Sequence, residues 1–152
     1  MAEFRTSIDI EAPPETVFAH LVTPERMVSW MGERADLEPV PGGRFAVDIG
    51  GVPFRGEYLE VEQPHRVVVS WGLAGSDDFP PGVSRVEFTL QPTPRGTTLH
   101  LLHTGLPESH AATHGLGWAH YLSRLQHSAS GNPPGPDPGF LISSHNQEEN
   151  AV

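Results

Sequence analysis

The chain has 152 residues, with 19 aspartates and glutamates against 9 arginines and lysines, a formal net charge of −10 and no cysteine. This length suits one domain with a sizeable core, and the missing cysteines exclude disulfides, thiolate catalysis and cysteine-ligated zinc. The acidic balance argues against nucleic acid as a partner, because that affinity depends on basic groups that displace counterions from phosphates. The cationic residues are all arginine, which excludes Schiff-base chemistry through lysine.

The amino-terminal sequence has neither the basic segment nor the apolar run of a secretory signal. No apolar stretch approaches the length of a membrane span. We therefore expect a cytoplasmic protein that does not insert into membranes.

The first elements are predicted to be a strand and two short helices. Ile8 and Ile10 alternate with polar neighbours over residues 4–11, as in a half-buried strand. Pro14 suits the first turn of the next helix, because its missing N–H has no helical partner there, and Thr23 is the expected N-cap of the second helix. The expected apolar faces are Val17, Phe18, Leu21 and Val22 in the first helix, and Met27, Trp30 and Met31 in the second.

The pattern then changes to a period of two, which predicts about six strands in succession. A short strand over residues 35–40 precedes strands with inward positions at 45, 47 and 49, at 54, 56 and 58, at 67, 69 and 71, at 86, 88 and 90, and at 99, 101 and 103. Gly50 and Gly51 indicate a hairpin, and residues 72–82 are expected to form a mobile loop.

An amphipathic helix closes the domain. Gly115 and Gly117 have low helix propensity, so this helix either begins near them or tolerates them because something approaches its backbone closely. The apolar stripe expected on this helix comprises Trp118, Leu122, Leu125 and Ala129.

After residue 131 the composition shifts to a run rich in proline and glycine, which cannot sustain a helix or a central strand. The predicted organisation is therefore one domain over residues 1–131 and a flexible tail over residues 132–152. The tail contains one apolar segment, residues 140–142.

The order of these elements, together with short motifs along the chain, resembles the SRPBCC superfamily, and within it the branch named for the activator of the heat-shock-protein-ninety ATPase. The resemblance covers roughly residues 8–129. The motifs are Pro14-Glu15-Thr16-Val17-Phe18, Trp30, Gly42-Gly43-Arg44-Phe45, Gly56-Glu57-Tyr58, Trp71, Gly96-Thr97-Thr98-Leu99, His103-Thr104-Gly105, and Gly117-Trp118 with Leu122 and Leu125.

The resemblance implies an α+β helix-grip fold. In that fold a curved antiparallel sheet of about six to seven strands wraps around a long C-terminal helix, and two short helices follow the first strand. Superfamily relatives bind lipids, sterols, hormones or polyketide intermediates in a cavity between sheet and helix, and some are aromatases or cyclases. The branch name also implies a chaperone as a partner.

Strand alternation and the helical stripe together give a candidate ligand-binding lining for such a cavity. A mainly apolar lining with a few polar anchors is typical of small-molecule pockets. The same residues also suit a filled core, which periodicity alone does not distinguish. The candidates are Trp30, Met31, Phe45, Val47, Phe54, Tyr58, Trp71, Phe88, Leu101, His103, Trp118, Tyr121 and Leu122.

His103 is expected on the inner face of the last strand, where it meets the final helix near His114 or Trp118. It can hydrogen-bond a ligand, act as a general base, or satisfy a polar network in the core. His110 and His114 have a spacing compatible with zinc, but no His-Glu-x-x-His pattern accompanies them. We predict no catalytic residue, no metal and no cofactor.

The leading hypothesis is non-catalytic binding of a hydrophobic or amphipathic small molecule, either a lipid or a polyketide-like compound, in an internal cavity. A second hypothesis is a polyketide cyclase or aromatase, or a hydrolase, that uses His103 or Tyr58 as acid or base. A third is a chaperone-associated protein that binds through its outer surface or its tail.

Overall fold

The computed structural model describes residues 2–132 together with residues 134 and 135. In this part of the chain seven strands form one sheet, in the order β1-β7-β6-β5-β4-β3-β2, with every neighbouring pair antiparallel. The strands are β1 (Ala2–Ile10), β2 (Arg34–Leu37), β3 (Arg44–Ile49), β4 (Val52–Glu62), β5 (Arg66–Leu73), β6 (Ser84–Thr93) and β7 (Gly96–Leu106). The helices are α1 (Pro14–Val22), α2 (Pro24–Met27) and α3 (Glu108–Ala129).

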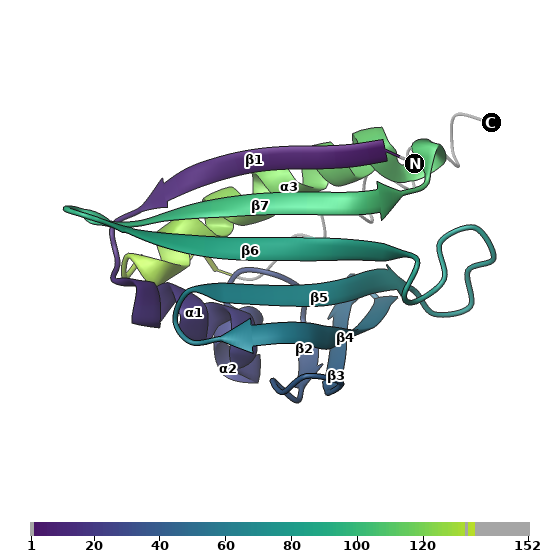
Figure 1. Ribbon diagram of the computed structural model, residues 1–152, viewed down its shortest axis with the longest axis horizontal. Coiled ribbons are helices and arrows are strands. Elements are labelled where there is room, and N and C mark those ends of the chain that lie inside the picture. Colours follow the sequence, from purple (N-terminus) through teal and green to yellow (C-terminus); the bar gives the residue numbers. More distant parts are fainter. Residues whose placement is uncertain (1, 133, 136–152) are drawn as a thin grey trace.

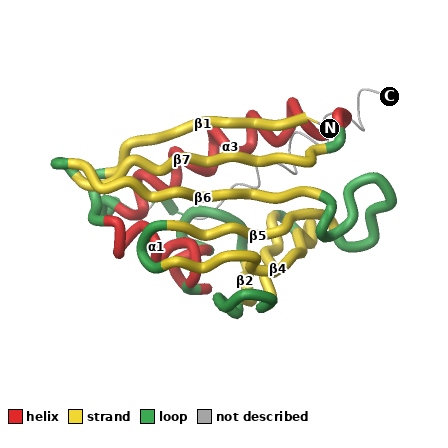
Figure 2. The backbone as a smooth tube through the Cα atoms, in the orientation of Figure 1, coloured by secondary structure: helices red, strands yellow, loops and turns green. Residues whose placement is uncertain are grey.

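Helix α3 runs behind β1 and β7, and α1 and α2 lie at the end of the sheet where α3 finishes (Figure 1). The connections between neighbouring strands are short, except for the loop that joins β5 to β6 at the end where α3 begins (Figure 2). The interior is therefore the layer between one face of the sheet and the helices.

Inward side chains form rows across the sheet because the strands pair in register. Tyr58 of β4 pairs with Val69 of β5. Val86 of β6 pairs with both Val69 and His103 of β7. Each of the four is 0% exposed, so the predicted period of two is confirmed and His103 lies in an otherwise apolar or aromatic row.

The short helices differ from expectation in two details. Pro14 stands in the first turn of α1, as predicted. Thr23 occupies the N-cap position of α2, but its side chain makes no capping hydrogen bond; its carbonyl oxygen instead accepts from the amides of Arg26 and Met27. The predicted N-cap residue is therefore confirmed, but it contributes through its backbone carbonyl and not through its side chain.

The helix α2 is also shorter than predicted. It ends at Met27, so Trp30 and Met31 follow the helix in a turn and are not part of its inward face. They are nevertheless only 0% and 1% exposed. The reversal at Gly32, with φ of +80°, directs the chain into β2 and leaves the two side chains in the core.

The long helix begins before its glycines, which settles the choice left open by the sequence. A Cβ atom at Gly115 would lie 3.3 Å from two ring carbons of Phe4 in β1. The glycine is therefore tolerated within the helix, and it lets the edge strand lie close to the helix backbone.

A curved antiparallel sheet on a long terminal helix, with two short helices after the first strand, is the predicted α+β helix-grip arrangement, which is confirmed. Within the described residues no helix is both long and apolar enough to cross a membrane. The domain boundary at residue 131 stays a prediction, and residues 140–142 of the tail lie outside the described residues.

Candidate functional site

All thirteen candidate lining residues are buried, and none has an exposed fraction above 3%. They come from five strands, from α3, and from the turn that follows α2. Burial alone does not separate a binding site from a filled core, so the contacts of their polar atoms have to make that distinction.

The first polar contact in the interior joins His103 of β7 to Trp118 of α3. The Trp118 Nε1–H donates to His103 Nδ1 at 3.0 Å. Nδ1 is therefore unprotonated, and His103 Nε2–H donates to Ser84 Oγ at 2.8 Å. The Ser84 hydroxyl donates in turn to the carbonyl oxygen of Trp71 at 2.7 Å. The expected meeting of His103 with the last helix is confirmed.

A second indole–imidazole pair lies beside the first. The Trp71 Nε1–H donates to His114 Nε2 at 3.3 Å, so His114 carries its proton on Nδ1, which donates to the carbonyl oxygen of His110 at 3.2 Å. The rings of His103 and His114 are 5.5 Å apart. The two histidines thus adopt opposite tautomers, and each accepts a hydrogen bond from a tryptophan.

Both imidazoles are held in the neutral form. Burial, with a smaller contribution from the nearby His114, lowers the pKa of His103 to about 3. Burial also lowers the pKa of His114 to about 4, against the opposing effect of its hydrogen bond to the His110 backbone. A second ring proton on either histidine would face an indole N–H, so the geometry opposes protonation as well. Neither group suits a general base at neutral pH.

Two other candidates act as cross-links within the core. The Tyr58 hydroxyl donates to the carbonyl oxygen of Leu21 at 3.0 Å, and Trp30 Nε1–H donates to that of His20 at 3.0 Å. Burial raises the pKa of Tyr58. These bonds tie α1 to the sheet and to the turn after α2, so neither polar group is free to meet a ligand.

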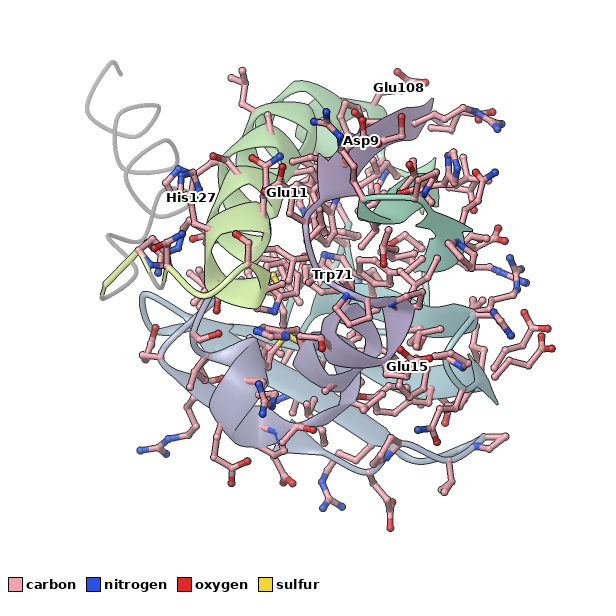
Figure 3. The ribbon with its side chains drawn as sticks, turned by 90° about the vertical axis from the view of Figure 1, so that its left-hand side faces the viewer. Asp9, Glu11, Glu15, Trp71, Glu108 and His127 are labelled. Atoms are coloured by element: carbon pink, nitrogen blue, oxygen red, sulfur yellow. The ribbon has the colours of Figure 1, made fainter. Side chains whose placement is uncertain are left out.

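Four of the thirteen candidates line a small void beneath α3. The other nine do not line it: Trp30, Phe45, Val47, Phe54, Tyr58, Phe88, Leu101, His103 and Leu122. The volume of the void is about 10 Å³, which is roughly the least space that one water molecule needs. Figure 3 places Trp71 in the interior, away from the labelled surface carboxylates. The lining combines four candidates with two residues outside the candidate set: Met31, Trp71, Trp118 and Tyr121, with His114 and Gly117.

Sequence reasoning assigned no role to Phe79. This residue lies in the loop between β5 and β6, yet its side chain is 0% exposed, while Asp77 and Asp78 beside it are exposed. The Phe79 ring centroid lies 4.8 Å from that of His110 and 5.1 Å from that of His114. One signal in the sequence indicated that Phe79 is buried: it is a single aromatic residue among glycines, aspartates and prolines. That signal does not indicate which surface the ring contacts.

A larger hollow opens on the outside of the molecule and does not belong to this cluster. It measures about 760 Å³ and lies between the end of β1, the β6–β7 turn and the end of α3. Its lining includes Asp9, Glu11 and His127, which reach the surface at one end of the molecule (Figure 3). The lining is polar and open, so it does not resemble the enclosed apolar site that the sequence predicted.

The spacing of His110 and His114 does not produce a metal site in the structure. Both ring nitrogens of His114 have hydrogen-bond partners, and His110 Nε2 faces Asp78 Oδ2 at 3.2 Å. Across residues 2–132, 134 and 135 no group of three or more histidine or carboxylate side chains is arranged to hold a metal ion.

A sheet that grips its terminal helix around an aromatic interior defines the helix-grip class of α+β proteins. Residues 11–129 match the family described as "Activator of Hsp90 ATPase homolog 1-like protein". The chain belongs to this family.

Individual relatives agree with that assignment. The solution structure of an AHSA1-like protein from Rhizobium etli is 43% identical, with 90% of this chain and 87% of that chain covered and a TM-score of 0.71. The crystal structure of DynU16, described as a putative protein in the dynemicin biosynthetic locus, is 27% identical over 86% of this chain and 48% of that chain, with a TM-score of 0.73. An uncharacterized protein of Schizosaccharomyces pombe is 26% identical over 70% of this chain, which spans only 30% of that relative's length.

Proposed function

We propose that this domain binds a hydrophobic or amphipathic small molecule, of a lipid-like or polyketide-like class, between the sheet and α3 without transforming it. The observation that carries the proposal is the void beneath α3, which is lined by aromatic rings from β5 and α3 and by the imidazole of His114. The rings of Trp71 and Trp118 lie 5.4 Å apart at this point. A mainly apolar wall with a small number of polar atoms suits an organic ligand.

Under this proposal the structure corresponds to the closed form of the site. A void of about 10 Å³ admits no organic molecule, so binding requires α3 or the β5–β6 loop to move away from the sheet. Gly117 lines the void, and glycine within a helix weakens it by about 1 kcal/mol relative to alanine. The wall that must move is therefore formed partly by a weakened segment of helix.

A non-catalytic role follows from the state of the polar groups. The two ring nitrogens of His103 are both occupied, and burial lowers its pKa to about 3. The Tyr58 hydroxyl is bonded to α1. Neither group is available as an acid or base, which argues against the cyclase and hydrolase hypotheses. DynU16, a relative from a biosynthetic locus, supports a natural product as the class of ligand.

Native mass spectrometry of gently purified protein, followed by NMR titration with lipids and polyketide-like compounds, tests the proposal. We expect a retained or added ligand and shifts of the residues around the void. Gly117→Val should fill the void and weaken binding at least tenfold. Leu116→Val changes a neighbouring side chain that is 63% exposed, so this matched control should bind as the wild type does. Absence of any adduct and of any shift with the whole panel would refute the proposal.

The closed interior also favours a second candidate, association with an Hsp90-class chaperone through the outer surface. The family description names the activator of the Hsp90 ATPase, and surface binding needs no internal cavity. The test is the ATP hydrolysis rate of the host's Hsp90-class chaperone with and without the protein. Stimulation supports this candidate, and an unchanged rate at saturating protein rejects it.

A further inference from the structure

Phe79 is a buried side chain carried by an exposed loop. Its backbone is held by two short-range contacts, in which Leu73 N–H donates to the Phe79 carbonyl at 2.7 Å and Phe79 N–H donates to Ser76 Oγ at 3.0 Å. The ring packs against the imidazoles of two histidines of α3. The Phe79 ring therefore joins the loop to the first turns of α3.

A second contact between this loop and α3 lies at the surface. Asp78 Oδ2 faces His110 Nε2 at 3.2 Å, and the two side chains are 66% and 25% exposed. Exposed polar contacts of this kind contribute little to stability. Of these two contacts, the burial of the Phe79 ring therefore contributes more, and a competing ring can replace it.

The Phe79 ring lies at the outer side of the proposed site. His114 contacts Phe79 on one side and lines the void on the other. It also contacts Phe54 and Trp71 within the core. One imidazole therefore separates Phe79 from the void, so withdrawal of Phe79 would uncover the imidazole that lines the void.

From this arrangement we infer that the β5–β6 loop is the entrance to the ligand site, and that an aromatic ring of the ligand takes the place of Phe79 against His110 and His114. This inference rests on the proposed function and narrows its ligand class. The position that Phe79 fills is flanked by rings at 4.8 and 5.1 Å, distances typical of aromatic pairs. The ligand must therefore present a flat ring.

The negative charge at the entrance restricts the class of ligand further. Asp77 and Asp78 flank Phe79 in sequence and are exposed, and the chain carries a net charge of −10. An anionic ligand would meet repulsion as it enters. The site is therefore assigned to an uncharged aromatic compound and not to a fatty-acid anion.

The test uses the full chain labelled with 4-fluorophenylalanine and followed by ¹⁹F NMR, with 2-naphthol as the probe. Phe79→Leu and Phe18→Leu assign the two signals of interest. We expect 2-naphthol to move the Phe79 signal to the position of a solvent-exposed ring, while the signal of Phe18, 5% exposed in α1 and outside the candidate lining, remains that of a buried ring. The anion 2-naphthoate and laurate should bind at least tenfold more weakly than 2-naphthol.

Phe79→Leu gives an independent readout, because it removes the competing ring but keeps an apolar side chain in the loop. We expect it to bind 2-naphthol about tenfold more tightly than the wild type, and Phe18→Leu, which changes a buried ring of α1 outside the candidate lining, to leave the affinity within twofold. Two results would refute the β5–β6 loop as the entrance and leave the proposed function standing. One is binding of 2-naphthol in the interior while the Phe79 signal remains that of a buried ring. The other is an equal change of the 2-naphthol affinity in the two leucine variants. If neither 2-naphthol, 2-naphthoate nor laurate binds any form at millimolar concentration, the proposed function fails together with the entrance.

Discussion

The two indole–imidazole pairs use the same chemistry in different surroundings. The His103–Trp118 pair joins β7 to α3, and the second nitrogen of its imidazole bonds to a side chain of the sheet. In the Trp71–His114 pair the second nitrogen bonds to a helix carbonyl, and the imidazole contacts the loop ring of Phe79. The first pair is enclosed by regular structure, whereas the second lies behind a loop.

This difference indicates that one pair stabilises the fold, while the other lies where a ligand would enter. The donor–acceptor distance is 3.0 Å in the first pair and 3.3 Å in the second. A buried donor that loses its partner costs more free energy than the bond itself contributes. We therefore regard the His103–Trp118 pair as part of the framework, and the Trp71–His114 pair as the part that ligand entrance disturbs.

The largest expected effect is a loss of stability in mild acid, to which both pairs contribute. The pKa of each histidine is lower in the folded protein, about 3 for His103 and about 4 for His114, than the ordinary value of 6.5 in the unfolded chain. The unfolded chain then binds more protons, so their contribution is complete above pH 6.5 and is lost as the pH falls toward 4 and 3. At pH 5 we expect the loss to reach roughly 4 kcal/mol for the two together.

Urea unfolding between pH 7 and pH 5 measures this loss. His103→Gln keeps a hydrogen-bonding side chain but removes one titrating group, so its stability should depend less steeply on pH than that of the wild type. His20, whose pKa burial also lowers, remains in both proteins and cancels in the comparison. Equal slopes for the variant and the wild type would show that His103 does not titrate on unfolding.

The next largest effect should separate the two pairs. His103→Leu leaves the Trp118 N–H without an acceptor and removes a donor from Ser84, and we expect a cost of about 3 kcal/mol. His114→Leu leaves the Trp71 N–H without a partner and removes a donor from the His110 carbonyl, but these bonds are longer, at 3.3 and 3.2 Å, and we expect about 1–2 kcal/mol. Urea unfolding at pH 7 measures both free energies. Equal costs would contradict the distinction between framework and entrance.

Removal of the sheet hydroxyl sharpens the same distinction. In Ser84→Ala, His103 Nε2–H and the Trp71 carbonyl oxygen both lose a partner, so we expect a cost of about 1–2 kcal/mol. Ser70→Ala is a suitable control, because Ser70 is also a buried sheet hydroxyl, 7% exposed, and its oxygen accepts from the Glu57 amide at 2.9 Å. In ¹⁵N spectra the imidazole signals of His103 should move in Ser84→Ala and not in Ser70→Ala. Unchanged signals in Ser84→Ala would exclude the hydrogen bond between His103 and Ser84.

The smallest expected effect concerns the surface contact that holds the β5–β6 loop against α3. Asp78→Asn removes an exposed ion pair with His110, so the midpoint of urea unfolding should not change measurably. Hydrogen exchange at the Leu73 amide, which donates to Phe79, should nevertheless become a few-fold faster, because the loop opens more often. The Val86 amide in the sheet serves as the reference. Faster exchange at both amides would indicate global destabilisation and not a local opening.

Much of the fold could be predicted because its signals are local. The alternation of Phe45, Val47 and Ile49 appears as three side chains no more than 2% exposed, and Pro14 opens α1 as expected. Positive φ angles at Gly50 and Gly51 fit the predicted hairpin. Each of these patterns depends on residues adjacent in sequence, and sequence reasoning reads such patterns directly.

The candidate site was less predictable, because its contacts join distant parts of the chain. His103 was expected near α3, but its bond to Ser84 depends on the pairing of β6 with β7. The burial of Phe79 depends on α3, which begins well after the loop ends. The short extent of α2 followed from the reversal at Gly32, which only the approach of β2 to β3 explains.

The sequence by itself determined the strand alternation, the apolar stripe of α3, the absence of cysteine and lysine chemistry, and the family resemblance. These properties depend on residue type and on spacing along the chain. Tertiary structure alone decided that the aromatic interior is closed, that His103 and His114 are neutral hydrogen-bond acceptors, and that Phe79 packs against His114. The physical reason is that void volume, tautomer and burial depend on which side chains of the sheet contact those of the helix. Periodicity along the chain carries no information about these contacts.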